Sequence, residues 1–218
     1  TIRGNIGGLA DQDLIVVTDV NNPKNTLAKA WGKQGSLLLK GKMKEPNQVV
    51  LGLRPSQKKL NLFIGNEDLQ VSGNINETAF QVSGSLIHSD FIEFQQLFDP
   101  LFQQLNELNQ KVNQSSPNDQ VALQGVYREH LSKIQRAIDS FVIEKRTSPL
   151  APFTLVVTSE LAQDPDLLER RFAQVDAAQQ KGFFGRVLQQ QIDDSKVGNV
   201  GSKAVQFTQN DTAGKIGR

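Results

Sequence analysis

The sequence contains no cysteine, and this absence removes several kinds of chemistry. A thiolate is the nucleophile of thiol–disulfide exchange, so no residue of this chain can carry out that reaction. Disulfide cross-links and zinc sites built on cysteine are excluded for the same reason. The absence does not fix the compartment, because cysteine-free chains occur in reducing and in oxidising environments.

Long apolar runs and a strong charge imbalance are also missing. No run approaches the roughly 20 apolar residues that span a bilayer. The formal net charge of +1 over 218 residues gives no global attraction to nucleic acid or membranes. Thr1 is followed by strand-like residues instead of a basic and then apolar leader, so an export signal has been removed or was never present. Length and a hydrophobic content of 38% fit one large or two small soluble domains.

Residues 1–89 have the pattern of an antiparallel β domain. Short runs alternate apolar and polar side chains and are separated by turn residues. Strands are predicted over residues 2–7, 14–19, 27–31, 36–43, 49–53, 60–64, 69–72 and 80–83. No helix of about ten residues fits between successive strands, so the pattern excludes parallel crossovers. It favours an antiparallel β-sandwich or an open barrel.

Residues 90–197 change to a helical period, which makes the whole chain α+β. Apolar residues recur at steps of three and four over a first long helix: Phe91, Phe94, Phe98, Leu101, Leu105, Leu108 and Val112. Asp90 with Glu93 is a start signal for this helix, and Pro100 predicts a kink or break near Asp99. A second helix follows the turn at 115–119, and an antiparallel hairpin is the simplest arrangement. Shorter helices are predicted over 152–161, 165–180 and 183–194.

The end of the chain carries a recognisable pattern. Residues 200–215 read Val-Gly-Ser-x-Ala-x-x-Phe-Thr-x-x-Asp-x-x-Gly-Lys. This pattern resembles the opening hairpin of the redoxin module in thioredoxin-like disulfide oxidoreductases of the TlpA/ResA type. In those proteins a Cys-x-x-Cys motif follows downstream. We therefore expect residues 198–218 to be a linker and the truncated start of such a module.

The order of the parts strengthens the resemblance. A β domain with Leu-Asn-Leu-Phe-Ile-Gly-Asn at 60–66, then helices that include Asp-Leu-Leu-Glu-Arg-Arg-Phe at 166–172, precedes the redoxin-like end. This order resembles the N-terminal domain of unknown function that precedes thioredoxin modules in envelope proteins of Bacteroidetes-type bacteria. The resemblance implies a periplasmic or cell-envelope location, with a lipid anchor at a residue upstream of Thr1 as an option. It also implies a C-terminal thioredoxin-like module as the partner.

Residues that commonly carry catalysis lack a supporting pattern. His88 and His130 stand far apart without metal-ligand spacing, and we expect both at the surface. Asp193 and Asp194 close a predicted helix and are expected to be solvated. No serine stands in a Gly-x-Ser-x-Gly motif. We predict no catalytic, cofactor-binding or metal-binding residue, and no enzyme activity for this chain.

One half of the predicted sheet is basic. Between Lys24 and Lys59 the only acidic residue is Glu45. The alternating Lys40, Lys42 and Lys44 are predicted to share one strand face. That face is either a solvated, lysine-guarded edge or an anion-binding surface for lipid headgroups, an acidic partner or glycan phosphates. The candidate contact residues are Lys40, Lys42, Lys44, Lys58, Lys59 and Trp31.

Two classes of function remain open. The first is a non-catalytic accessory domain that positions, or contacts partners for, a C-terminal thiol–disulfide oxidoreductase module. The second is an independent envelope binding module that uses the basic sheet face, with envelope proteins or an anionic surface as partners. Nucleic acid is not expected, because few aromatic residues stand among the basic ones. An unrecognised hydrolase has no group of residues behind it.

Overall fold

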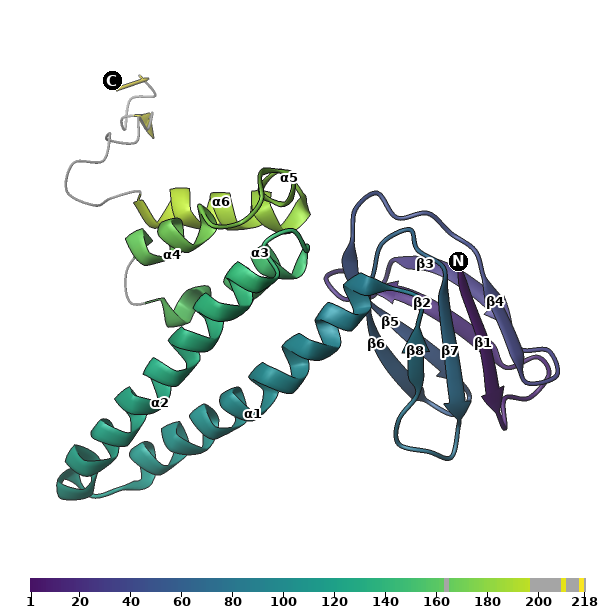
Figure 1. Ribbon diagram of the computed structural model, residues 1–218, viewed down its shortest axis with the longest axis horizontal. Coiled ribbons are helices and arrows are strands. Elements are labelled where there is room, and N and C mark those ends of the chain that lie inside the picture. Colours follow the sequence, from purple (N-terminus) through teal and green to yellow (C-terminus); the bar gives the residue numbers. More distant parts are fainter. Residues whose placement is uncertain (163–164, 197–208, 211–215, 218) are drawn as a thin grey trace.

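The computed structural model describes residues 1–162, 165–196, 209–210 and 216–217 of the chain. Two four-stranded sheets form an open β-sandwich, and helices follow it along the chain (Figure 1). The predicted α+β class, with an N-terminal sheet region before a helical region, is confirmed. The sheets do not close into a barrel.

The sandwich is built from eight short strands. They are β1 (Ile2–Gly7), β2 (Leu14–Asp19), β3 (Thr26–Trp31), β4 (Ser36–Leu39), β5 (Asn47–Arg54), β6 (Lys58–Ile64), β7 (Leu69–Asn74) and β8 (Gln81–Ser83). The first sheet has the order β4-β1-β7-β8, and the second has the order β3-β2-β5-β6. Apolar side chains alternate inward along each strand, so the two inner faces form one core.

One strand pair contradicts the sequence prediction. β1 and β7 are parallel, in a register that runs from Ile2 opposite Leu69 to Gly7 opposite Asn74. The prediction that the pattern excludes parallel pairing was wrong, because it considered only successive strands joined by a helix. Here the chain between β1 and β7 passes through the second sheet, so other strands make the crossover.

The helical region begins with a long hairpin, as predicted (Figure 1). Its elements are α1 (Leu86–Gln114), α2 (Pro117–Glu144), α3 (Leu150–Val157), the 3₁₀ turn η1 (Ser159–Leu161), α4 (Pro165–Phe172), α5 (Ala177–Gln180) and α6 (Phe183–Lys196). α1 runs through Pro100, so the break expected near Asp99 is absent. Because proline has no N–H, the carbonyl of Gln96 loses its helical donor at Pro100. Both residues are exposed, so solvent can reach this carbonyl.

The start of α1 also differs from the prediction. Ser85 caps the helix by accepting a hydrogen bond from the backbone N–H of His88 at 3.0 Å. Asp90 and Glu93 instead form ion pairs with Lys145, which follows α2. The Lys145 side chain is only 14% exposed. Burial disfavours its charged form, but hydrogen bonds to Glu93 and Asp90 outweigh this effect and raise the pKa of Lys145.

An aromatic cluster joins the sandwich to the helices. Phe63 lies on β6 but belongs to the helical core and is fully buried. Its ring centroid lies 5.8 Å from that of Phe91, 5.3 Å from that of Phe153 and 5.5 Å from that of Phe184. These three residues come from α1, α3 and α6. The sandwich and the helices therefore share one packed core at this point.

Both histidines are buried, so the expectation that they lie at the surface was wrong. His88 is 3% exposed, and its Nδ1 accepts a hydrogen bond from the backbone N–H of Phe63 at 3.4 Å. Burial lowers the pKa of His88. His130 is 5% exposed, and its Nε2 lies 2.8 Å from the carbonyl oxygen of Leu101. Each ring bonds to a backbone group of a neighbouring element, β6 for His88 and α1 for His130, which is a structural role.

The end of the chain is described only in part. β9 (Gln209–Asn210) and β10 (Ile216–Gly217) pair antiparallel, with Ile216 opposite Asn210. The remainder of the predicted linker and redoxin-like start lies outside the described residues, so those assignments stay predictions. Among the helices that are described, none is long and apolar enough to cross a membrane.

Candidate functional site

The predicted contact residues do not share one surface. β4 ends at Leu39, so Lys40, Lys42 and Lys44 lie exposed in the loop that leads to β5. The prediction that they alternate on a strand face was wrong. This loop is attached elsewhere: Met43 donates its N–H to Asn66 Oδ1 at 2.8 Å and accepts from Asn66 Nδ2 at 2.9 Å. The chain therefore turns towards the connection between β6 and β7 instead of extending the strand.

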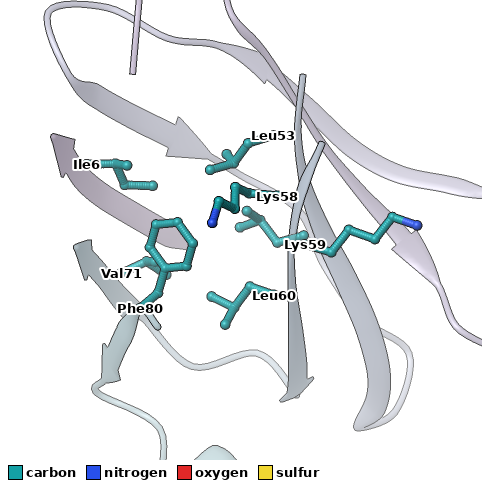
Figure 2. Close-up of a pocket in the computed structure, with 8 residues that line it drawn as sticks. Ile6, Leu53, Lys58, Lys59, Leu60, Val71 and Phe80 are labelled. Atoms are coloured by element: carbon teal, nitrogen blue, oxygen red, sulfur yellow. The ribbon is translucent and has the colours of Figure 1, made fainter. Parts of the chain in front are cut away.

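Lys58 and Lys59 occupy successive positions of β6 and point to opposite sides of the sheet (Figure 2). Lys58 reaches between the two sheets beside Phe80, where its ammonium donates to the carbonyl oxygen of Glu77 at 2.9 Å. Its stem helps to line a small apolar cavity that is too narrow to hold a water molecule. Lys59 points away from that cavity. Of these two lysines, only Lys59 presents its ammonium on the outside of the sandwich.

Lys59 and Trp31 lie on the face of the second sheet that points away from the sandwich core. Strand register places Trp31, Leu14 and Arg54 in one row across β3, β2 and β5. The next row across the sheet consists of Lys29, Val16, Gly52 and Lys59. We call this surface the outer face and define it by Leu14, Val16, Thr18, Lys29, Trp31, Val50, Gly52, Arg54, Lys59 and Asn61.

The floor of the outer face is apolar and hollowed. Val16 and Val50 are half-buried, and Gly52 between them has no side chain. A Cβ atom added at Gly52 would meet only the carbonyl oxygen of Val16, at 3.9 Å. The β2–β3 loop at Pro23 and the β5–β6 turn at Pro55 border the hollow. A protruding group of a partner can therefore approach the sheet backbone at Gly52.

The rim of the outer face is basic. Lys29, Arg54 and Lys59 are exposed, and none of them has an ion pair within the part of the chain that the structure describes. Asp19, the carboxylate beside the hollow, accepts hydrogen bonds from the Asn21 N–H at 2.8 Å and from Asn47 Nδ2 at 3.3 Å. Three cations against this single carboxylate leave the surface with a net positive charge.

Trp31 stands at the edge of this basic rim. It is 62% exposed, on the edge strand β3. Tryptophan and arginine are the residue types most enriched among energetically dominant interface positions.

The sequence predicted Trp31 and Lys59 as contact residues but not Lys29 and Arg54. Strand parity was the available signal, because residues 29 and 31 lie two positions apart on one predicted strand and so share a face.

The helices cover only one end of this face. Phe63, which is opposite Gln48 in the register, points from the same side of the sheet into the helical core. α1 packs against β6 there. Towards Trp31 and Arg54 the side chains become exposed. The outer face is thus an uncovered continuation of the surface on which the helices dock.

No group of at least three His, Asp or Glu side chains in the described ranges could hold a metal ion.

Residues 1–91 match a family model. It is described as Domain of unknown function (DUF4369). The match spans the complete sandwich and the first residues of α1, so the whole outer face lies within it. No curated protein and no solved structure matches the chain. An N-terminal domain of unknown function, as the resemblance implied, is thereby supported.

Proposed function

We propose that this chain is a non-catalytic accessory module that binds an acidic protein surface through the outer face. In this proposal it precedes a thioredoxin-like disulfide oxidoreductase module in the cell envelope. The observation that carries the binding role is the set of three exposed cations around the side-chain-free floor at Gly52, none of which forms an ion pair with another described residue: Lys29, Arg54 and Lys59. The redox context is supported by the redoxin-like pattern at 200–215.

The shape of the outer face favours a protein partner over a bilayer. Lys29 and Lys59 stand at opposite ends of one row across four strands, which corresponds to about 14 Å between strand axes. A protruding segment can place apolar groups against Val16 and Val50 while its carboxylates reach the rim. A flat membrane surface would contact the rim and leave the floor empty. An apolar centre with a charged rim is the usual anatomy of a protein interface.

The helical region supplies a fixed connection in this proposal. The Phe63 cluster holds the sandwich on the helices, and Arg186 of α6 pairs with Glu45 of the β4–β5 loop at 2.6 Å and 3.0 Å. α6 starts beside the sandwich and runs away from it towards Lys196 (Figure 1). A module joined beyond α6 would therefore follow the end of that helix that points away from the sandwich.

Charge reversal tests the binding role. Trp31 is the only tryptophan, so its fluorescence reports on the outer face alone. We expect a peptide of alternating glutamate and leucine to change this emission at low salt and to bind at least tenfold more weakly to the double variant Lys29→Glu, Lys59→Glu. Tenfold corresponds to about 1.4 kcal/mol, the scale of two lost rim contacts. Raising the salt concentration should weaken wild-type binding.

The matched control is Lys44→Glu with Lys111→Glu, which makes the same charge change at exposed positions outside the outer face. This variant should bind as the wild type does. The proposal is wrong if the peptide leaves Trp31 emission unchanged, if both double variants lose binding equally, or if phosphatidylglycerol vesicles bind to the outer face and the peptide does not. Both variants should unfold as the wild type does, within about 0.5 kcal/mol, because the substituted side chains are exposed.

The alternative function is an independent envelope binding module. It is favoured by the fact that the outer face lies entirely within the matched residues 1–91. Both functions use the same surface, so the reading frame beyond Arg218 distinguishes them. A Cys-x-x-Cys motif a few tens of residues downstream supports the accessory role, and a frame without it supports the independent module.

A further inference from the structure

The open sandwich leaves β6 as an edge strand of the second sheet. Short or irregular edge strands resist the addition of a further strand. The other three edge strands have such features: β4 and β8 contain four and three residues, and the pairing of β3 with β2 shifts register. β6 contains seven residues and pairs with β5 in an unbroken register. Among these edges, β6 is therefore the one best suited to accept another strand.

Neighbouring hydrogen bonds show which backbone groups of β6 are free. The N–H of Phe63 donates to His88 Nδ1, so it points away from β5. Gln48, opposite Phe63 in the register, bonds towards the β2 side instead. Backbone groups alternate in direction along an antiparallel strand, so those of Asn61 and Lys59 also point away from β5. Within the described ranges, no hydrogen bond engages these groups.

A groove of about 660 Å³ lies along this edge, between β6, β8 and the start of α1. Its apolar lining is incompletely covered, since Leu60, Phe80 and Val82 are half-buried and Ile92 is 38% exposed. Leu60 points towards the first sheet, on the side where Phe80 lies (Figure 2). An added strand would place every second side chain over these residues. We call this site the edge groove and define it by Lys59, Leu60, Asn61, Phe80, Val82 and Ile92.

Two lysines decide which part of the edge is open and which charge it favours. An inward-pointing charge protects a sheet edge, and Lys58 has this position at the start of β6. Its ammonium is held by the carbonyl oxygen of Glu77, so the open part of the edge begins at Lys59. Lys59 is the only lysine, arginine or carboxylate among the described residues that line the groove. Acidic side chains of a partner are therefore favoured beside Lys59.

His88 supplies a further donor at the end of the groove nearest α1. Its ring is 3% exposed and lines the groove. Because Nδ1 accepts a hydrogen bond from the Phe63 N–H, the proton of the neutral ring is on Nε2. No described residue accepts a hydrogen bond from Nε2. A buried donor without a partner is rare in folded proteins, and a carbonyl oxygen of a bound strand would satisfy it.

We propose that the edge groove binds an extended segment of a partner protein as an added strand on β6. Main-chain hydrogen bonds to Lys59 and Asn61 hold the segment, and its alternate side chains lie over Leu60 or beside the Lys59 ammonium. The segment therefore alternates apolar and acidic residues. The edge groove shares only Lys59 and Asn61 with the outer face and does not use the floor at Gly52. Either surface can therefore fail as a binding site without the other.

The two histidines of the chain provide a reporter and its internal control. In protein labelled with ¹³C at histidine Cε1, a short peptide of alternating valine and glutamate should shift the His88 resonance in a saturable manner. The resonance of His130, which bonds to the Leu101 carbonyl in the helical hairpin, should stay in place. Trp31 lies on the opposite edge strand, so its emission reports separately on the outer face.

Two altered peptides test the mode of binding on the wild-type protein. The same peptide with an N-methylated backbone keeps its side chains but has no N–H to donate, so it should bind at least tenfold more weakly. A peptide of alternating valine and lysine places like charges beside Lys59 and should also bind at least tenfold more weakly at low salt.

Substitutions at Asn61 separate its backbone from its side chain. Asn61→Pro removes an edge N–H but keeps the bonds to β5, which Leu60 and Leu62 make, and it should weaken binding of the valine–glutamate peptide at least tenfold. Asn61→Thr keeps the N–H at the same exposed position and should bind as the wild type does. The N-methylated peptide keeps the test decisive if Asn61→Pro does not fold. An unmoved His88 resonance, equal shifts of both histidines, equal affinity for either altered peptide, or wild-type affinity in folded Asn61→Pro would overturn the proposal.

Discussion

Replacing Phe63 by alanine is expected to lower the free energy of unfolding by about 3 to 5 kcal/mol, the range for fully buried phenylalanines. Phe63 is 0% exposed, and its ring contacts those of Phe91, Phe153 and Phe184. The substitution leaves a cavity at the joint between β6 and three helices. Urea denaturation followed by circular dichroism measures the loss. Because the joint is the affected point, the sandwich and the helices should also begin to unfold in separate steps.

Phe102→Ala is the matched control for this prediction. Phe102 is half-buried on α1, and its ring lies 5.6 Å from that of Phe98, away from the sandwich. Its removal should cost clearly less than that of Phe63 and should leave a single transition. Equal losses for the two variants would show that Phe63 does not couple the sandwich to the helices.

Neutralising Asp90 and Glu93 together is expected to destabilise the protein by about 3 kcal/mol. The variant Asp90→Asn, Glu93→Gln removes the two nearer carboxylates of the largely buried Lys145 ammonium and leaves only the exposed Glu144, at 3.9 Å. An uncompensated buried charge is more costly than the loss of the whole pair. Adding Lys145→Met should therefore restore most of the stability. Denaturation of the double and triple variants at pH 7 measures both effects.

The alkaline limb of the stability curve gives an independent check. The pKa of Lys145 is raised in the folded state. Its ion pairs therefore contribute their full amount to the free energy of unfolding below the unfolded lysine pKa of about 10.4. The contribution is lost as the pH rises through the higher pKa of the folded protein.

The control for the double variant is Glu129→Gln. It removes an exposed i,i+4 pair with Lys133 and should cost about 0.5 kcal/mol or less at pH 7. A triple variant no more stable than the double variant would contradict the buried-charge argument.

Much of the fold could be predicted because it depends on local periodicity. Alternation placed β1 and β2 at their observed bounds, and steps of three and four placed the hairpin of α1 and α2. The parallel pairing of β1 with β7 could not be predicted, because it depends on how distant strands share two sheets. The docking of helices on β6 did leave a local signal. Leu62, Phe63 and Ile64 are consecutive apolar residues, which indicates a strand buried on both faces.

The candidate surface was only partly predictable. Alternating lysines after Leu39 looked like a strand face, but strand character depends on a partner, and that segment bonds to Asn66 instead. The outer face depends on register between four strands, which brings Lys29 and Lys59 into one row although 30 positions separate them in the numbering. Single-strand patterns do not contain this register. Likewise, Asp90 and Glu93 resemble a helix start, and only the folded hairpin places Lys145 beside them.

Blocking the floor of the outer face tests the account most directly. Phenylalanine at Gly52 would project into open space above the sheet without changing charge or disturbing the core. Gly125→Phe, at an exposed position of α2 with no neighbouring atom within 4 Å, is the matched control. Calorimetric titration with the acidic peptide should show at least tenfold weaker binding for Gly52→Phe and wild-type affinity for Gly125→Phe. Unchanged affinity in Gly52→Phe would contradict the assignment of the outer face as the binding surface.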